Sequence, residues 1–200
     1  MKPAAAAGRA ARAVSLFLLL LLSACATPAS QAPGTAVAAA APQRPPADLK
    51  ADWWRDNRWR YADDAQANAA YDRLVVSQSP WPEWHQAEVV NLPAGLRFQM
   101  ALAPGQPVDK PGAFGTFDWI PNARFVRYAL AVKVAWKPVV DRVVTYEIVD
   151  PLPADTGVVG PQIDGDANLY LPGGASQLEM KVPAAERIAH LRVVEVRPIA

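Results

Sequence analysis

The sequence holds very little cysteine or histidine. Cys25 is the one cysteine, so an intramolecular disulfide and a cysteine-based zinc site are both excluded. The two histidines, His85 and His190, are far apart and show no metal-binding spacing, so no metal is expected. The motifs GxxxxGK[ST], GxGxxG and GxSxG are absent as well, which argues against phosphate-loop ATPases, Rossmann enzymes and hydrolases with a nucleophile elbow.

Long runs of like charge are also lacking. The chain has 20 Lys+Arg against 19 Asp+Glu and a formal charge of +1. A nucleic-acid partner is not expected, because binding phosphates needs a concentrated positive field. The 20 prolines and 11 glycines favour short strands and turns over a helical bundle. After the N-terminal region, roughly 150 residues remain, which is enough for one domain with a real core.

The N-terminus has the pattern of an export signal. Basic residues precede an apolar run at 13–22, which is too short to span a bilayer that needs about 20 residues. Leu22-Ser23-Ala24-Cys25 resembles the lipobox of bacterial lipoproteins, which implies a signal peptide over 1–24 and lipidation of Cys25. By the same resemblance, Ala26 favours an outer-membrane or cell-envelope location. The alternatives are an ordinary cleaved signal peptide and a secreted product.

The rest of the chain divides by composition. Residues 25–47 are rich in Ala and Pro without apolar periodicity, which predicts a disordered tether. Residues 48–86 hold five of the seven tryptophans and predict one or two helices, with Asp63-Asp64 capping a helix that runs to about Val76. If the preceding stretch is helical, Trp54, Arg58, Tyr61 and Ala65 share one face.

Residues 87–200 change to a strand-like pattern. Apolar and polar residues alternate at 96–102 and 176–182, and β-branched residues are frequent at 142–149. Further strands are expected at 157–163 and 190–196. Pro151-Leu152-Pro153 and Leu171-Pro172-Gly173-Gly174 are expected to form turns that separate the strands. The expected fold is α+β, a compact and mostly antiparallel β-sheet domain behind one or two N-terminal helices.

Three segments, taken in order, resemble the tuberculosis necrotizing toxin (TNT) family of secreted NAD glycohydrolases. Residues 109–117 place a lysine before a glycine turn that ends in an aromatic, and residues 125–130 carry an arginine. The third segment follows and has three parts: a strand at 144–147, the stretch 157–161, and a turn at 172–179 that contains Gly-Gly and a glutamine. The resemblance covers about residues 95–182.

The resemblance implies a site. Arg127 matches the family's catalytic arginine and Gln177 its catalytic glutamine, and the two would meet in one cleft from distant strands. The other implied substrate-binding residues are Lys110, Phe114, Phe117, Gly173, Gly174 and Glu179. The chain departs from the family at Ala131, where proline is usual, at Lys110, where arginine is usual, and at Phe117, where tyrosine is frequent.

The residue types suit NAD(P) cleavage on chemical grounds. Nicotinamide leaves a cationic pyridinium as a neutral ring, so the paired carboxylates of ordinary glycosidases are not required. The site must hold the dinucleotide, stabilise an oxocarbenium-like ribose and aim a water. Arginine can bind the pyrophosphate, and a glutamine amide can orient the ribose or the water. No cofactor is implied, because NAD or NADP is the substrate.

Plainer interpretations stand beside this one. Arg127 could be a solvated strand-edge cation, Gln177 a solvent-facing residue, and the glycine pair only a turn. Gln177-Leu178-Glu179 also fits the Gln-x-Glu pattern of ADP-ribosyltransferases. A non-enzymatic envelope lipoprotein would bind a partner through the tryptophans at 53–84. A toxin would imply an immunity protein as a partner, and a lipidated Cys25 would imply the membrane as another.

Overall fold

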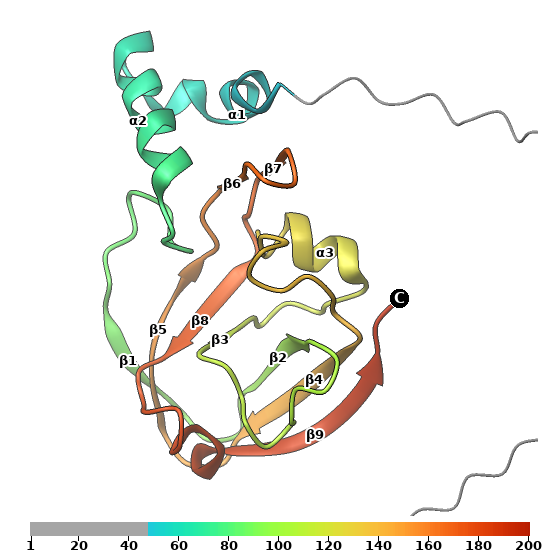
Figure 1. Cartoon of the computed structure of the whole chain (residues 1–200). Coiled ribbons are helices and arrows are strands. Elements are labelled where there is room, and N and C mark those ends of the chain that lie inside the picture. Colours follow the sequence, from blue (N-terminus) through green and yellow to red (C-terminus); the bar gives the residue numbers. More distant parts are fainter. Residues whose placement is uncertain (1–47) are drawn as a thin grey trace, which may run out of the picture. The chain divides into compact units, whose positions relative to one another are not determined.

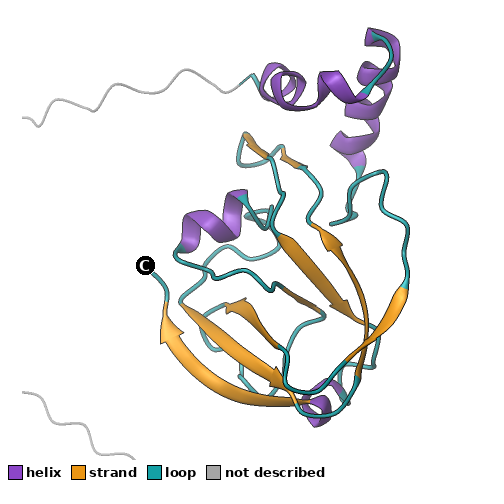
Figure 2. Ribbon diagram, turned by 180° about the vertical axis from the view of Figure 1, so that it is seen from behind, coloured by secondary structure: helices purple, strands orange, loops and turns teal. Residues whose placement is uncertain are grey.

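A computed structural model describes residues 48–200 (Figure 1). The predicted signal peptide, Cys25 and tether lie outside the described residues. Within the described part, three α-helices and nine strands form an α+β fold with antiparallel strand pairs, which confirms the predicted class. Helices α1 and α2 lie at one end of the strands, and the short 3₁₀ helix η2 (Arg187–His190) lies at the other (Figure 2). In residues 48–200, no helix combines the length and apolarity needed to cross a membrane.

The N-terminal helices begin at aspartate caps. The Asp48 side chain accepts from the Ala51 N–H at the start of α1 (Leu49–Asn57). Asp63 accepts from Gln66 at the start of α2 (Asp64–Val76), which confirms the predicted cap and the predicted end. The expected four-residue face is wrong, because α1 ends at Asn57 and only the 3₁₀ turn η1 (Arg58–Arg60) follows before the chain extends at Tyr61.

The helical segment is fixed to the β domain through Trp53. This side chain is 2% exposed and packs with Ala67 and Ala70 of α2. The same cluster includes Ile163 and Tyr170, which lie on the two-stranded sheet of β6 (Gln162–Asp164) and β7 (Leu169–Leu171). The tryptophan-rich segment therefore shares a core with the strands.

Two larger sheets form the body of the domain. The first has the order β1-β5-β8-β3, and the second has the order β2-β4-β9. The bounds in the first sheet are β1 Val89–Leu92, β5 Leu152–Val158, β8 Ser176–Met180 and β3 Phe114–Gly115. Those in the second are β2 Arg97–Leu102, β4 Arg142–Ile148 and β9 Leu191–Pro198. The inward faces of both sheets meet in one apolar core that includes Phe98, Met100, Tyr146, Leu152, Leu178 and Met180.

Three further local predictions are wrong. Residues 157–163 do not form one strand, because β5 ends at Val158 and β6 begins at Gln162. Residues 152–158 form one strand, so Pro153 lies inside β5 and does not punctuate it; as the second residue of the strand it interrupts little of the ladder. Arg127 lies on a helix, α3 (Ala123–Tyr128), and not on a strand. Asn122 caps this helix by accepting from the Phe125 N–H at 2.9 Å, and Val126 is its buried residue.

Candidate functional site

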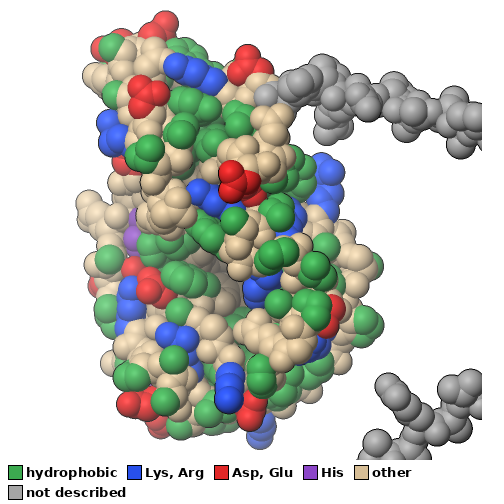
Figure 3. All heavy atoms as spheres, viewed as in Figure 1, with side chains coloured by type: hydrophobic (Ala, Val, Ile, Leu, Met, Phe, Trp, Pro, Cys, Tyr) green, Lys and Arg blue, Asp and Glu red, His purple; other side chains and the backbone are tan. Residues whose placement is uncertain are grey.

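A cleft of about 430 Å³ opens between the two large sheets and helix α3. Gln99, Met100 and Ala101 of β2 form its floor. Residues 112–116 and Gln177 form one wall, and Val126, Leu130, Val132, Trp136 and Lys137 form the opposite wall. Gln78 and Pro80 close a third side from the segment after α2. Figure 3 shows this face hollowed near its centre, with hydrophobic and basic side chains around the hollow.

Gln177 is the most unusual group in this cleft. Its side chain is 5% exposed, and its amide nitrogen Nε2 has no hydrogen-bond partner. Buried donors are normally paired, since an unpaired one costs about 1–3 kcal/mol. Gln99 lines the same cleft but is satisfied, because its Oε1 accepts from the Ile120 N–H at 2.8 Å and its Nε2 donates to Thr145. The Gln177 amide nitrogen is thus an unpaired donor on a residue that lines the cleft.

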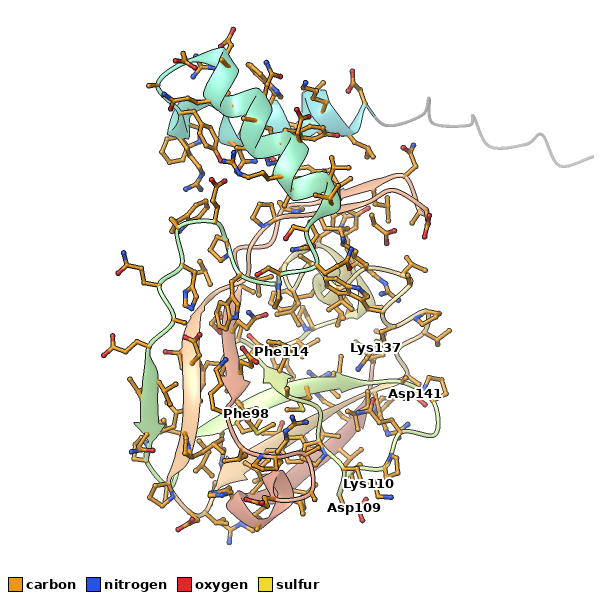
Figure 4. The ribbon with its side chains drawn as sticks, turned by 60° about the vertical axis from the view of Figure 1, so that its left-hand side comes forward. Phe98, Asp109, Lys110, Phe114, Lys137 and Asp141 are labelled. Carbon is orange, nitrogen blue, oxygen red and sulfur yellow. The ribbon has the colours of Figure 1, made fainter. Side chains whose placement is uncertain are left out.

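The wall beside Gln177 combines a glycine that packs on the core with an exposed aromatic ring. Gly115 pairs with Leu178 of β8, and a Cβ at Gly115 would come within 2.6 Å of the Phe98 ring. Phe114 lines the cleft and is 44% exposed. Figure 4 shows Phe114 and Lys137 on opposite sides of the open space. A planar ring of a ligand therefore has an aromatic surface next to the free amide.

Lys137 is the one charged side chain among the described residues that line the cleft. Its Nζ donates to the carbonyl of Ala101 on the floor at 2.5 Å. Burial, and next the charge of Arg127, lower the pKa of Lys137. The ammonium is incompletely neutralised by its surroundings, which suits a bound anion.

Arg127 lies behind this wall, outside the cleft lining. Its Nη1 donates to the carbonyls of Val132 (3.1 Å) and Lys133 (3.2 Å). Its Nη2 donates to the carbonyls of Lys137 and Pro138, the second at 2.9 Å. Burial lowers the pKa of Arg127, and the charge of Asp164 opposes that shift. The guanidinium thus fixes the segment 132–138 that carries Trp136 and Lys137.

The backbone before that segment explains a departure from the TNT pattern. Ala131 has φ +46°, and its side chain is 1% exposed. Proline requires a φ near −65°, so this turn cannot accept the residue that is usual in the family. The turn lets the chain leave α3 and return under the guanidinium of Arg127.

Most of the other predicted ligand-binding residues lie away from the cleft lining. Lys110 is exposed and lies with Asp109 on a separate loop (Figure 4). Phe117 is 41% exposed outside the lining. Gly173, at φ +71°, donates to the carbonyl of Tyr128, and Gly174 donates to that of Val159, so both hold the turn before β8 against α3 and β5. Their predicted contacts with a substrate stay predictions.

Glu179 shares the strand of Gln177 but has other partners. Its Oε2 accepts from Lys181 Nζ at 2.6 Å and from the indole N–H of Trp81 at 3.3 Å. Trp81 stacks on His85, whose Nε2 lies 3.0 Å from the buried Asp155 carboxylate. Glu179 therefore helps to anchor the segment after α2, and only the glutamine of the Gln-x-Glu pattern lines the cleft.

Sequence reasoning missed Gln78, Trp136 and Lys137. The available signal was weak: an aromatic and a lysine stand together just before Pro138. The expected partner surface at 53–84 is mixed, since Trp53 is buried whereas Trp59 and Trp84 are 71% and 49% exposed. Within residues 48–200, no group of three or more His, Cys, Asp or Glu could hold a metal ion.

Comparisons with known proteins give distant structural likenesses. No protein-family model matches the chain, and no curated protein matches it. The structure of Tne2 in complex with Tni2 gives 24% identity and a TM-score of 0.49, covering 60% of this chain and 97% of that one. Tse6 in complex with Tsi6 gives 15% identity and a TM-score of 0.38, covering 74% and 94%.

A third solved structure, Rhs1-CT in complex with its cognate immunity protein RhsI1, gives 16% identity and a TM-score of 0.34. It covers 57% of this chain and 81% of that one. All three TM-scores lie below 0.5, so membership of the TNT family stays a prediction.

Proposed function

We propose that the chain is an NAD(P)+ glycohydrolase that cleaves the bond between nicotinamide and ribose. The single observation that carries the proposal is the buried, unpartnered amide of Gln177 in an apolar cleft whose charged lining residue is a lysine. A dinucleotide supplies what each group lacks: ribose oxygens for the amide donor, phosphates for the ammonium and a planar ring for Phe114.

The reaction needs positioning and charge stabilisation more than proton transfer. The bond between C1′ and the pyridinium nitrogen breaks with its electron pair on nitrogen, so nicotinamide leaves neutral. Water adds to the oxocarbenium-like C1′ and loses one proton to solvent, which gives ADP-ribose. In this scheme Gln177 orients the ribose or the attacking water, and Lys137 holds the phosphates.

The direct test is to incubate the purified protein with NAD and with NADP and to follow nicotinamide and ADP-ribose by chromatography. We expect equal amounts of nicotinamide and free ADP-ribose (or its 2′-phosphate) without added metal. Transfer of the ADP-ribosyl group to protein would instead indicate a transferase. An unchanged dinucleotide pool at micromolar enzyme would contradict the proposal.

Replacing Lys137 by methionine is expected to raise the KM for NAD about tenfold or more. A charge-assisted hydrogen bond contributes about 1.5–3 kcal/mol, and its loss weakens phosphate binding. Because burial and Arg127 lower the pKa of Lys137, its ammonium loses its proton at a lower pH than an exposed lysine does. KM for NAD should therefore rise in the alkaline range in the parent protein and lose that rise in Lys137→Met.

The matched control is Lys110→Met, which removes an exposed lysine outside the cleft lining. Its KM should stay within twofold of the parent value. An increase in KM with Lys110→Met and none with Lys137→Met would restore the phosphate contact to Lys110 and remove it from Lys137.

The predicted export, lipidation of Cys25, envelope location and immunity partner remain part of the proposal. They concern residues or partners outside the described structure, and each is testable separately. Metabolic labelling with a fatty acid, compared between the parent and Cys25→Ser, tests the lipid anchor.

A further inference from the structure

Trp136 is an exposed tryptophan inside the cleft. Its side chain is 42% exposed, and it lines the wall next to Lys137. One face of the indole is backed by the Lys133 ammonium, which lies 5.1 Å from the ring centroid. Lys133 is itself 6% exposed and donates to the carbonyl of Ser77 at 3.3 Å. The ring therefore has the ammonium of a buried lysine on one face, and a large part of the side chain remains exposed.

The other described tryptophans lie outside the lining of this cleft. Trp53 is buried in the helical segment, and Trp81 stacks on His85. Trp59 and Trp84 both lie against the guanidinium of Arg60. Trp119 is 58% exposed and lies on Arg197 at 3.9 Å, outside the cleft lining. Among the described tryptophans, Trp136 is therefore the one that lines the cleft, and it belongs to neither of the large sheets.

The cleft floor sets an order along the site. At one end, Gln99 forms a β-bridge with Thr116, the residue that follows β3, and β3 pairs with the strand β8 that carries Gln177. Two residues further along β2, Ala101 accepts from Lys137. That step along an extended strand is about 7 Å, so the amide and the ammonium lie over successive parts of the floor. The indole of Trp136, the neighbour of Lys137 in the chain, stands beside this ammonium in the lining of the same cleft.

These three groups suit the parts of a dinucleotide. With the nicotinamide ribose at Gln177 and the phosphates at Lys137, the next group along the molecule is the adenosine. We infer that Trp136 is the platform on which the adenine ring stacks, a specificity-determining contact that rests on the proposed function. Bases stack on aromatic side chains through their π faces, and a cation behind the indole does not obstruct this.

The test compares Trp136→Ala with Trp119→Ala, two exposed tryptophans that both lie against a cation. The probes are ADP-ribose, which holds adenine, and nicotinamide mononucleotide, which holds the scissile bond without adenine. We expect Trp136→Ala to weaken ADP-ribose binding in calorimetry about tenfold and to raise the KM for NAD by a similar factor, with kcat within about twofold. Trp136→Phe should retain most of the affinity, and Trp119→Ala should match the parent.

Nicotinamide mononucleotide separates stacking from a structural effect. Its inhibition constant against NAD should be equal in the parent and in Trp136→Ala. An equal loss for both ligands would overturn the adenine platform, and so would an unchanged KM and unchanged ADP-ribose affinity in Trp136→Ala. If that variant and the parent both hydrolyse NAD normally, only the platform is lost; a parent protein that neither cleaves NAD nor binds ADP-ribose loses the proposed function as well.

Discussion

Replacing Gln177 by methionine is expected to lower NAD turnover at least about 100-fold while raising the stability of the protein. Removing one hydrogen-bond donor aimed at a transition state typically costs 10²–10³ in kcat. The amide nitrogen has no partner in the folded chain, so its burial costs about 1–3 kcal/mol that an apolar side chain of similar volume avoids. Turnover is measured as nicotinamide release, and stability as the free energy of unfolding in urea.

The control is Gln99→Met, which changes a second buried glutamine in the same cleft. Its amide oxygen accepts from the Ile120 N–H, so its loss leaves that donor unpaired. We therefore expect Gln99→Met to lower the free energy of unfolding by about 1–3 kcal/mol. If Gln177→Met destabilises the protein as much as Gln99→Met does, the Gln177 amide has a structural partner and is not reserved for a ligand.

The sheet residues could be predicted because their pattern is local. Period-two alternation located β2 and β8 to within one or two residues of their observed ends, since one face of each strand must meet the core. Gln177 falls at a buried position of β8, and the sequence could nominate it through its place beside the glycine turn. Its missing hydrogen-bond partner depends on distant residues and could not be predicted.

The cleft wall formed by residues 126–137 could not be predicted from local sequence patterns. Helix α3 has only six residues, which is too few for a clear helical period. The segment after it has no regular structure, and its shape comes from Ala131 at positive φ and from carbonyls gathered around Arg127. Gln78 and Pro80 reach the cleft because the segment after α2 is held by hydrogen bonds from Gly160 and Gln162, which are far away in the sequence. The predicted division at 86/87 therefore separates residues that line one cleft.

The position of Arg127 suggests that it supports catalysis indirectly, by holding other residues in place. The resemblance implies that Arg127 is the catalytic arginine, and its chemistry would let it hold the pyrophosphate, whereas its guanidinium donates to four carbonyls of the segment 132–138. That segment carries Trp136 and Lys137 into the cleft. Arg127 is in this view a positioning residue. Direct contact with the pyrophosphate and positioning of this segment predict different effects of an Arg127 substitution on the stability of the ligand-free protein.

Replacing Arg127 by alanine is expected to cut NAD turnover at least about 100-fold and to lower the free energy of unfolding by about 2–4 kcal/mol. The stability loss follows because several partly buried carbonyls lose a charged donor together. Arg127→Lys should restore little of either quantity, since a single ammonium lacks the planar fork that reaches four acceptors. Turnover and urea unfolding are measured on the same preparations, with no nucleotide in the unfolding experiment.

Arg124→Ala is the matched control for this helix. The Arg124 guanidinium lies over the Tyr128 ring at 4.7 Å on the exposed side of α3, so its removal should change the free energy of unfolding by less than about 1 kcal/mol. A variant Arg127→Ala that keeps full stability but loses turnover would favour direct contact with the pyrophosphate. One that loses stability yet regains turnover when a high NAD concentration is supplied would place its effect in the assembly of the Lys137 wall, because ligand binding to the folded state offsets the cost of ordering that segment.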